Sequence, residues 1–83
     1  MTKEELIKNL ENLGVSKRYY SLDGHQTTDC IVVLKNNKQF KVAYISDRGE
    51  MEAYGIFKDI EGAFQKVYDL FLFDANNSRS TLG

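Results

Sequence analysis

Two short polar turns in the middle of the chain constrain the fold most, because they separate three segments with strand-like sequence. Residues 35–38 include two Asn residues, which tolerate the positive φ that a tight hairpin requires. Residues 47–50 include Gly49 at the position of a turn that favours glycine. Strands joined by turns this short run antiparallel. The middle of the chain is therefore predicted to form a three-stranded antiparallel meander.

The three strand segments differ in which faces carry apolar side chains. Residues 30–34 are apolar without interruption and rich in β-branched residues, so both faces of this strand would be apolar. This strand is expected at the centre of the sheet or covered on both sides. Residues 51–57 form the third strand, in which Tyr54 lies on the face opposite Met51 and Ala53. The second strand alternates and has one predicted core face, which carries Phe40, Val42 and Tyr44.

A helical pattern precedes the meander. Thr2 and Glu5 have the spacing of a capping box, and Gly14 has the position of a left-handed C-terminal cap. Between them an apolar stripe repeats with helical spacing, so an amphipathic helix is predicted over residues 3–13. Residues 16–20 are expected to form one short helical turn, and 21–24 a turn closed by glycine. The stripe consists of Leu6, Leu10 and Leu13.

A second helical pattern follows the meander. Asp59 is the predicted N-cap, and Gly62 in the first turns would permit a close approach to the sheet. Leu70 and Phe73 widen the apolar stripe beyond what one flat face requires. The stripe itself consists of Ile60, Ala63, Phe64, Val67, Tyr68 and Phe71.

The order helix, meander, helix predicts one α+β domain over residues 1–74, with both helices on the sheet face that carries Phe40, Val42 and Tyr44. Residues 75–83 show no period and are interpreted as a C-terminal tail.

Charge and composition exclude several classes of protein. The 83 residues carry 11 Lys and Arg against 12 Asp and Glu, so the chain lacks the basic excess that is typical of nucleic-acid binders. The run 17–20 mixes two bases with two tyrosines, but two bases are too few for a single-strand-binding surface. No membrane-spanning run or signal-peptide pattern is found. A cytoplasmic location without membrane or nucleic-acid partners is therefore expected.

Few side chains in the sequence are suited to catalysis. Cys30 and His25 would be the thiolate and imidazole of a nucleophilic pair, with Asp23 orienting the imidazole. However, Cys30 lies inside an apolar strand, where a cysteine behaves as a small hydrophobe. A metal site formed by His25, Asp23 and Asp29 is not predicted either, because the chain has no second histidine to serve as a ligand. A non-enzymatic protein with no metal and no cofactor is predicted, and a small hydrolase or thiol enzyme is the weakest alternative.

The charges are distributed unevenly along the chain. Residues 1–41 hold seven bases and five acids, a net charge of +2, whereas residues 42–83 hold four bases and seven acids, a net charge of −3. An acidic surface with exposed tyrosine would suit binding of a basic protein. The competing interpretation is a solvated face with acids placed at a helix N-terminus. The predicted contact residues are Asp47, Glu50, Glu52, Tyr54, Asp59 and Glu61.

Several short motifs resemble the small immunity proteins of bacterial polymorphic, contact-dependent toxin systems. The similarity covers about residues 2–73, and Gly62 and the C-terminal tail depart from the family pattern. The matching residues are Leu13-Gly14, the run Tyr20-Ser21-Leu22-Asp23-Gly24, the turn Ser46-Asp47-Arg48-Gly49, and then Phe57, Asp59, Glu61, Ala63 and Tyr68.

The resemblance implies a non-enzymatic protein that binds a cognate toxin domain inside the cell and blocks it by steric occlusion. A nuclease toxin would suit the acidic half of the chain, because nuclease surfaces are basic. The main alternative is a small structural or regulatory module that self-associates through the exposed edge of the meander or through the last helix.

Overall fold

The predicted meander is present, and a fourth strand makes the sheet mixed. The computed structural model describes the backbone of residues 1–82 and the side chains of residues 1–76. Strands β2 (Cys30–Asn36), β3 (Gln39–Ile45) and β4 (Met51–Phe57) pair antiparallel in sequence order. The two turns use the left-handed conformation, with φ of 57° at Asn37 and 84° at Gly49.

The prediction of three strands is incomplete, because β1 (Tyr20–Ser21) pairs parallel with β2. The sheet order is β1-β2-β3-β4. A strand of two residues is too short to show an alternating pattern in the sequence. It directly follows the predicted helical turn, which is the 3-10 helix η1 (Lys17–Tyr19). Strand β2 is thus internal to the sheet, as its apolar sequence predicted.

Helix α1 (Lys3–Asn12) has the two end signals that the sequence showed. The Thr2 hydroxyl accepts a hydrogen bond from the Glu5 backbone N–H (3.2 Å), and the Glu5 carboxylate accepts one from the Thr2 N–H (2.9 Å). At the C-terminal end, Gly14 has φ of 80°, and the Val15 N–H donates to the Leu10 carbonyl (2.9 Å). This is a Schellman cap, which satisfies carbonyls that the helix leaves without a partner.

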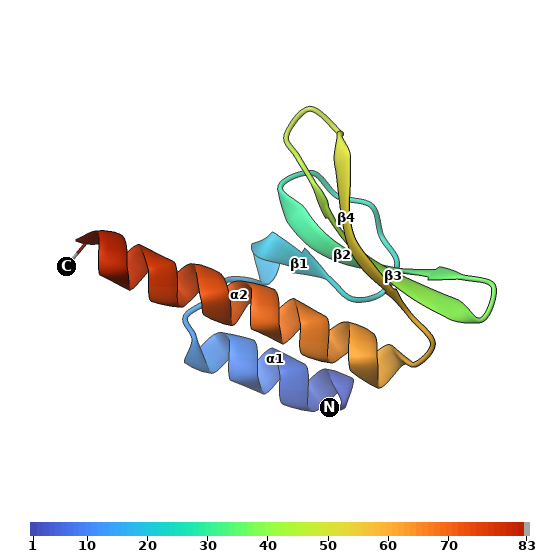
Figure 1. Cartoon of the computed structure of the whole chain (residues 1–83), viewed down its shortest axis with the longest axis horizontal. Coiled ribbons are helices and arrows are strands. Elements are labelled where there is room, and N and C mark those ends of the chain that lie inside the picture. Colours follow the sequence, from blue (N-terminus) through green and yellow to red (C-terminus); the bar gives the residue numbers. More distant parts are fainter. Residues whose placement is uncertain (83) are drawn as a thin grey trace.

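Helix α2 (Ile60–Leu82) begins after Asp59, whose carbonyl accepts a bond from the Ala63 N–H (3.3 Å). Residues 75–82 continue this helix, although their sequence predicted a tail without a period. Gly83 lies outside the described residues. Figure 1 shows that α1 and α2 run parallel and that α2 extends well beyond the end of α1.

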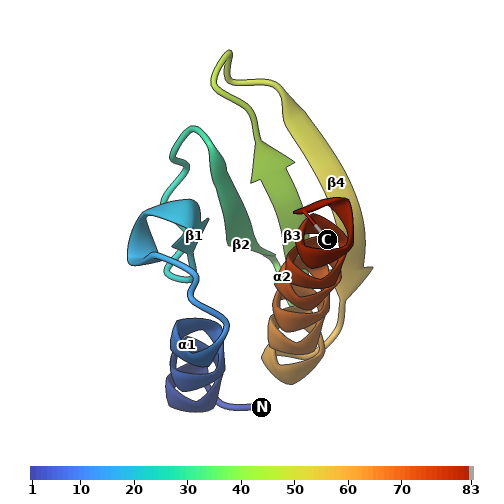
Figure 2. The same ribbon diagram turned by 90° about the vertical axis from the view of Figure 1, so that its left-hand side faces the viewer.

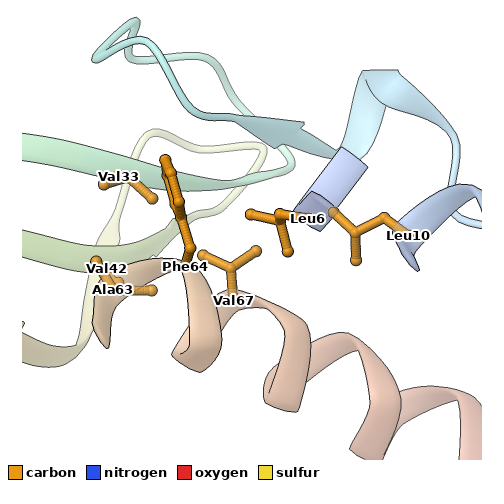
Figure 3. Packing of buried hydrophobic residues seen from close by; sticks show 7 residues of the cluster. All are labelled: Leu6, Leu10, Val33, Val42, Ala63, Phe64 and Val67. Carbon is orange, nitrogen blue, oxygen red and sulfur yellow. The ribbon is translucent and has the colours of Figure 1, made fainter. Parts of the chain in front are cut away.

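Both helices pack on one face of the sheet, as predicted. Figure 2 shows α2 nearly end-on with α1 beside it, on the same side of the strands. Phe40 and Phe57 pack against the edge of the resulting core. Tyr44, which was expected under the helices, is absent from this cluster. The buried cluster, drawn in Figure 3, comprises Leu6, Leu10, Val33, Val42, Ala63, Phe64 and Val67.

The opposite face of the sheet carries a second, smaller buried cluster. Its members are Cys30, Val32, Ala43 and Ile45, with Leu34 packed against them. Strands β2 and β3 therefore bury side chains on both faces of the sheet.

A β-bulge shifts the alternation of β4. Val42 pairs with Gly55 whereas Ala43 pairs with Ala53, so Tyr54 is the extra residue on this strand. Gly55 and Phe57 consequently lie on the helix side of the sheet. Ile56, which is 63% exposed, lies on the other side together with Met51. The sequence pattern placed Tyr54 opposite Met51 and Ala53, and that placement is confirmed.

Two glycines near Phe57 should respond in opposite ways to replacement by alanine. A Cβ on Gly62 would lie 3.4 Å from Phe57 Cδ1, which is an ordinary contact. We expect Gly62→Ala to raise the free energy of unfolding by up to about 1 kcal/mol, because alanine is the better helix former. A Cβ on Gly55 would lie 3.1 Å from the Phe57 ring. Since that ring packs against the core, Gly55→Ala should lower the free energy of unfolding by about 1 kcal/mol or more.

Urea denaturation of the two variants and the parent chain measures both effects. An equal gain for both variants would show that the Phe57 ring is free to move, contrary to its packing against the helices.

Candidate functional site

A cleft of about 1150 Å³ lies on the helix side of the sheet, next to the core. Its walls come from the segment after α1, from the later turns of α2 and from the ends of β2, β3 and β4 where the β3–β4 turn begins. The cleft follows from the unequal lengths of the helices. At 1.5 Å per residue, α1 spans about 15 Å and α2 about 34 Å, so α2 continues where α1 no longer packs against it.

Five of the 16 residues that line this cleft are aromatic. Three of them are substantially exposed: Tyr19 at 50%, Tyr54 at 37% and Phe73 at 68%. Deeper in the wall, the Phe71 ring packs edge to face on Tyr20, with ring centroids 6.2 Å apart. A small domain seldom leaves several aromatic rings exposed in one place unless they contact another molecule. The aromatic lining residues are Tyr19, Tyr44, Tyr54, Phe71 and Phe73.

Carboxylates lie among these rings. Asp29, which has a left-handed backbone (φ of 58°), accepts a hydrogen bond from the Tyr44 hydroxyl at 3.4 Å. Burial raises the pKa of Tyr44, and the charges of Asp29 and Asp47 raise it further. Burial also raises the pKa of Tyr54, with a smaller effect from Glu52. Asp29 and Glu52 thus each act on a cleft tyrosine.

The later turns of α2 contribute a further carboxylate, Asp74, to the cleft lining, and Arg18 contributes a cation. We call Asp29, Asp47, Glu52 and Asp74 the acidic rim. Asp29 and Asp74 belong to the cleft lining, whereas Asp47 and Glu52 lie beside it, in the β3–β4 turn and in β4 opposite Tyr44. The cleft therefore combines exposed π-faces with negative charge.

The structure brings together four of the six residues that the sequence predicted as contacts. Asp47, Glu50, Glu52 and Tyr54 lie in the β3–β4 turn and the first half of β4. The Ser46 hydroxyl fixes this turn by accepting hydrogen bonds from the backbone N–H groups of Arg48 (3.3 Å) and Glu50 (3.2 Å). All four predicted residues are exposed.

The other two predicted residues, Asp59 and Glu61, lie at the opposite end of β4. A strand of seven residues spans about 20 Å, so these carboxylates and the β3–β4 turn are not parts of one small site. The Glu61 carboxylate lies 3.9 Å from the N-terminal amine of Met1. Their role as contacts stays a prediction.

Sequence reasoning missed several cleft residues for identifiable reasons. Tyr44 fitted the core face of its strand, and the sequence did not show that this end of the face lines a cleft instead of the core. Tyr19 is the last residue of η1 and belongs to no periodic pattern. Phe73 did leave a signal, because it widened the helical stripe beyond a single face. Asp29 and Asp74 are isolated acids, which the charge distribution alone could not assign to one site.

The residues of the thiol-enzyme alternative have other partners. Cys30 is 3% exposed, and its Sγ donates a hydrogen bond to the Arg18 carbonyl at 2.9 Å. Burial raises the pKa of this thiol, and the charge of Asp29 adds to the effect, so both favour the neutral form. The Asp23 carboxylate forms an ion pair with Lys3, which lowers the pKa of Asp23. His25 lies in an exposed loop.

Among the residues whose side chains are described, no three His, Cys, Asp or Glu residues gather closely enough to hold a metal ion. Within the same part of the chain, neither helix is long and apolar enough to cross a membrane. No protein-family model, curated protein or solved structure matches this chain.

The hydrogen bond between Asp29 and Tyr44 is testable by titration. Because the negative charge of Asp29 disfavours the phenolate, Asp29→Asn should lower the pKa of Tyr44 toward its ordinary value. Asparagine also tolerates the left-handed backbone at this position. The ring-carbon chemical shifts of Tyr44, followed by NMR between neutral and alkaline pH, report the pKa directly.

Asp47→Asn is the matched control, because it removes the same charge without removing a hydrogen bond to Tyr44. It should lower the pKa of Tyr44 by less. If the two variants had equal effects, or none, the contact between Asp29 and Tyr44 would not be present in solution.

Proposed function

We propose that this chain is a non-enzymatic protein that neutralises a bacterial toxin domain by binding and occluding it, as the small immunity proteins that it resembles do. The observation that carries the proposal is the cleft, in which exposed aromatic rings lie beside carboxylates. Tyrosine and other aromatic residues are enriched where proteins bind other proteins. The cognate partner would be a basic toxin domain, such as a nuclease, inside the cytoplasm of the cell that makes both.

The exposed lining of the cleft favours a macromolecular partner. Pockets for small molecules usually have volumes of about 300–1,000 Å³ and bury most of their ligand. The present cleft, at about 1150 Å³, is near the upper end of that range, but exposed aromatic side chains of α2 and η1 lie along it. A segment of a protein fits such a surface better than a metabolite does. The buried thiol and the ion-paired Asp23 further support a binding role over a catalytic one.

The acidic residues around the β3–β4 turn support a basic partner. Asp47, Glu50 and Glu52 are all exposed around the β3–β4 turn, next to the cleft. Acidic groups at the edge of an interface accelerate the capture of a basic protein and disfavour partners of the wrong charge. Their contribution falls as the salt concentration rises, because exposed charges are screened.

Charge reversal at two separate places tests which end of β4 binds the toxin. The candidate partner to test is the product of the gene that neighbours the gene of this chain. We expect the double variant Glu50→Lys with Glu52→Lys to weaken binding by about tenfold or more at low salt, mainly through slower association. Isothermal titration calorimetry and stopped-flow association rates measure the two effects.

The matched control is Asp59→Lys with Glu61→Lys, which changes the net charge by the same amount at the far end of β4. It should leave the toxin affinity nearly unchanged. Equal losses in both double variants would show only a non-specific charge effect, and no loss in the first would remove the acidic turn from the interface. Thermal unfolding of each variant, measured beforehand, separates binding effects from loss of fold.

A specific observation also supports a second candidate function, self-association through β4. Within the described residues, β4 has a strand neighbour on one side only, and its Met51 and Ile56 side chains are 40% and 63% exposed. An exposed edge strand with apolar side chains is a template for pairing with another chain. A second copy would then extend the sheet across this edge.

Light scattering on the purified chain distinguishes the two candidate functions. We expect the mass of a single chain at micromolar concentration, because the proposed toxin-binding cleft lies on the helix side of the sheet and needs no second copy. A stable dimer that Ile56→Lys converts to monomers would instead establish the β4 edge as the principal interface. The control is Lys8→Glu, which changes an exposed position of α1 away from β4. Ile7→Lys is unsuitable for this purpose, because Ile7 is half-buried.

A further inference from the structure

We propose that the cleft is a receptor for an arginine side chain, which the partner presents on a segment that also carries apolar residues. This inference rests on the proposed function and specifies the chemistry by which the partner is recognised. The cleft offers the two kinds of group that a guanidinium binds best in proteins. These are flat aromatic faces for stacking and carboxylates for charge-assisted hydrogen bonds.

The aromatic groups line the cleft from three different parts of the fold. Tyr44 and Tyr54 come from the neighbouring strands β3 and β4, and both side chains belong to the cleft lining. Phe73 faces the same space from α2. A cation over an aromatic face is attracted by the ring electrons, and the attraction increases when water is partly excluded, as it is in a cleft.

The carboxylates are distributed so that a cation between the walls meets negative charge on both sides. Asp29 directly precedes β2, and Asp74 lies in α2. Glu52 is paired directly with Tyr44 across β3 and β4, and Asp47 lies in the turn that joins these strands. Among the lining residues, Asp29 and Asp74 outnumber the one cation, Arg18. Charge complementarity therefore selects a basic segment over an acidic one.

Arginine suits this site better than lysine. The guanidinium is planar, delocalised and weakly hydrated, so it stacks on a ring while its N–H groups reach a carboxylate. The ammonium of lysine is compact and strongly hydrated, and it gains less from an aromatic wall. The apolar lining, which includes Ile31 and Leu70, favours aliphatic residues next to the arginine in the partner segment.

A set of three peptides tests this proposal on the intact chain. The probe is acetyl-Ala-Leu-Arg-Leu-Ala-amide, compared with the same peptide carrying citrulline or lysine in place of arginine. Citrulline has nearly the shape of arginine but no charge. Titration of the isotopically labelled chain, followed by NMR, locates the peptide and measures its dissociation constant. We expect the arginine peptide to shift the signals of Asp29, Tyr44 and Tyr54, with about tenfold weaker binding for citrulline and an intermediate value for lysine.

Two variants identify the groups that hold the arginine. Phe73→Leu removes an aromatic face at a position that is 68% exposed, so the fold should be kept. Asp74→Asn removes one carboxylate of the acidic rim. Each should weaken the arginine peptide several-fold. Asp69→Asn is the matched control, because Asp69 is an exposed residue of the same helix, outside the cleft lining and hydrogen-bonded to Gln65 (3.0 Å).

Equal affinity for the arginine and citrulline peptides, signal shifts outside the cleft, or equal effects of Asp74→Asn and Asp69→Asn would each overturn the proposal. So would concentration-dependent shifts of the cleft signals without peptide, because a second copy would then be the occupant.

The toxin measurement separates the two proposals. If the toxin binds and Phe73→Leu leaves its affinity unchanged, the arginine receptor is wrong while toxin binding stands. If the arginine peptide binds and the toxin does not, the immunity function is wrong while the receptor stands.

Discussion

The packing of α2 against the sheet is the contact on which the rest of the structure depends. Ala63, Phe64 and Val67 are buried against Val33 and Val42 of the two central strands, and α1 completes the same core. Each large side chain buried in this way contributes roughly 1.5–3 kcal/mol. Because this cluster occupies only the first turns of α2, it fixes the direction of the helix while leaving the later turns beside an open space. The core and the cleft are thus two consequences of one packing arrangement.

The bulge in β4 decides which residues in the second half of this strand face the helices. With uninterrupted alternation, Gly55 would share a face with Ala53, and Phe57 would lie away from the helices. The extra residue at Tyr54 returns Gly55 and Phe57 to the helix side and leaves Ile56 on the other. Tyr54 lines the cleft with or without the bulge, because it precedes the shifted residues. The added residue thus places Phe57 against the core and leaves Ile56 exposed on the same side as Met51.

The chemistry of the polar groups is consistent with recognition of another macromolecule. The thiol of Cys30 is buried and hydrogen-bonded to a backbone carbonyl, a setting in which a cysteine is inert. By contrast, the tyrosines with exposed rings and the acids around them lie at one end of the sheet, where the turn fixed by Ser46 holds Asp47 and Glu50 outward. This division between a closed core and an open aromatic end is the basis of the proposed toxin-binding role.

The sequence by itself determined the elements whose signals are local. The capping box at Thr2, the left-handed residues in the turns, and the spacing of Leu6 and Leu10 each act over a few residues, so helices, turns and the meander followed from them. Only the tertiary structure decided where Tyr44, Asp29 and Phe73 meet, and that Asp59 and Glu61 lie apart from the β3–β4 turn. These relations depend on the unequal lengths of two packed helices and on how the strands pair, and both involve contacts between residues far apart in the chain.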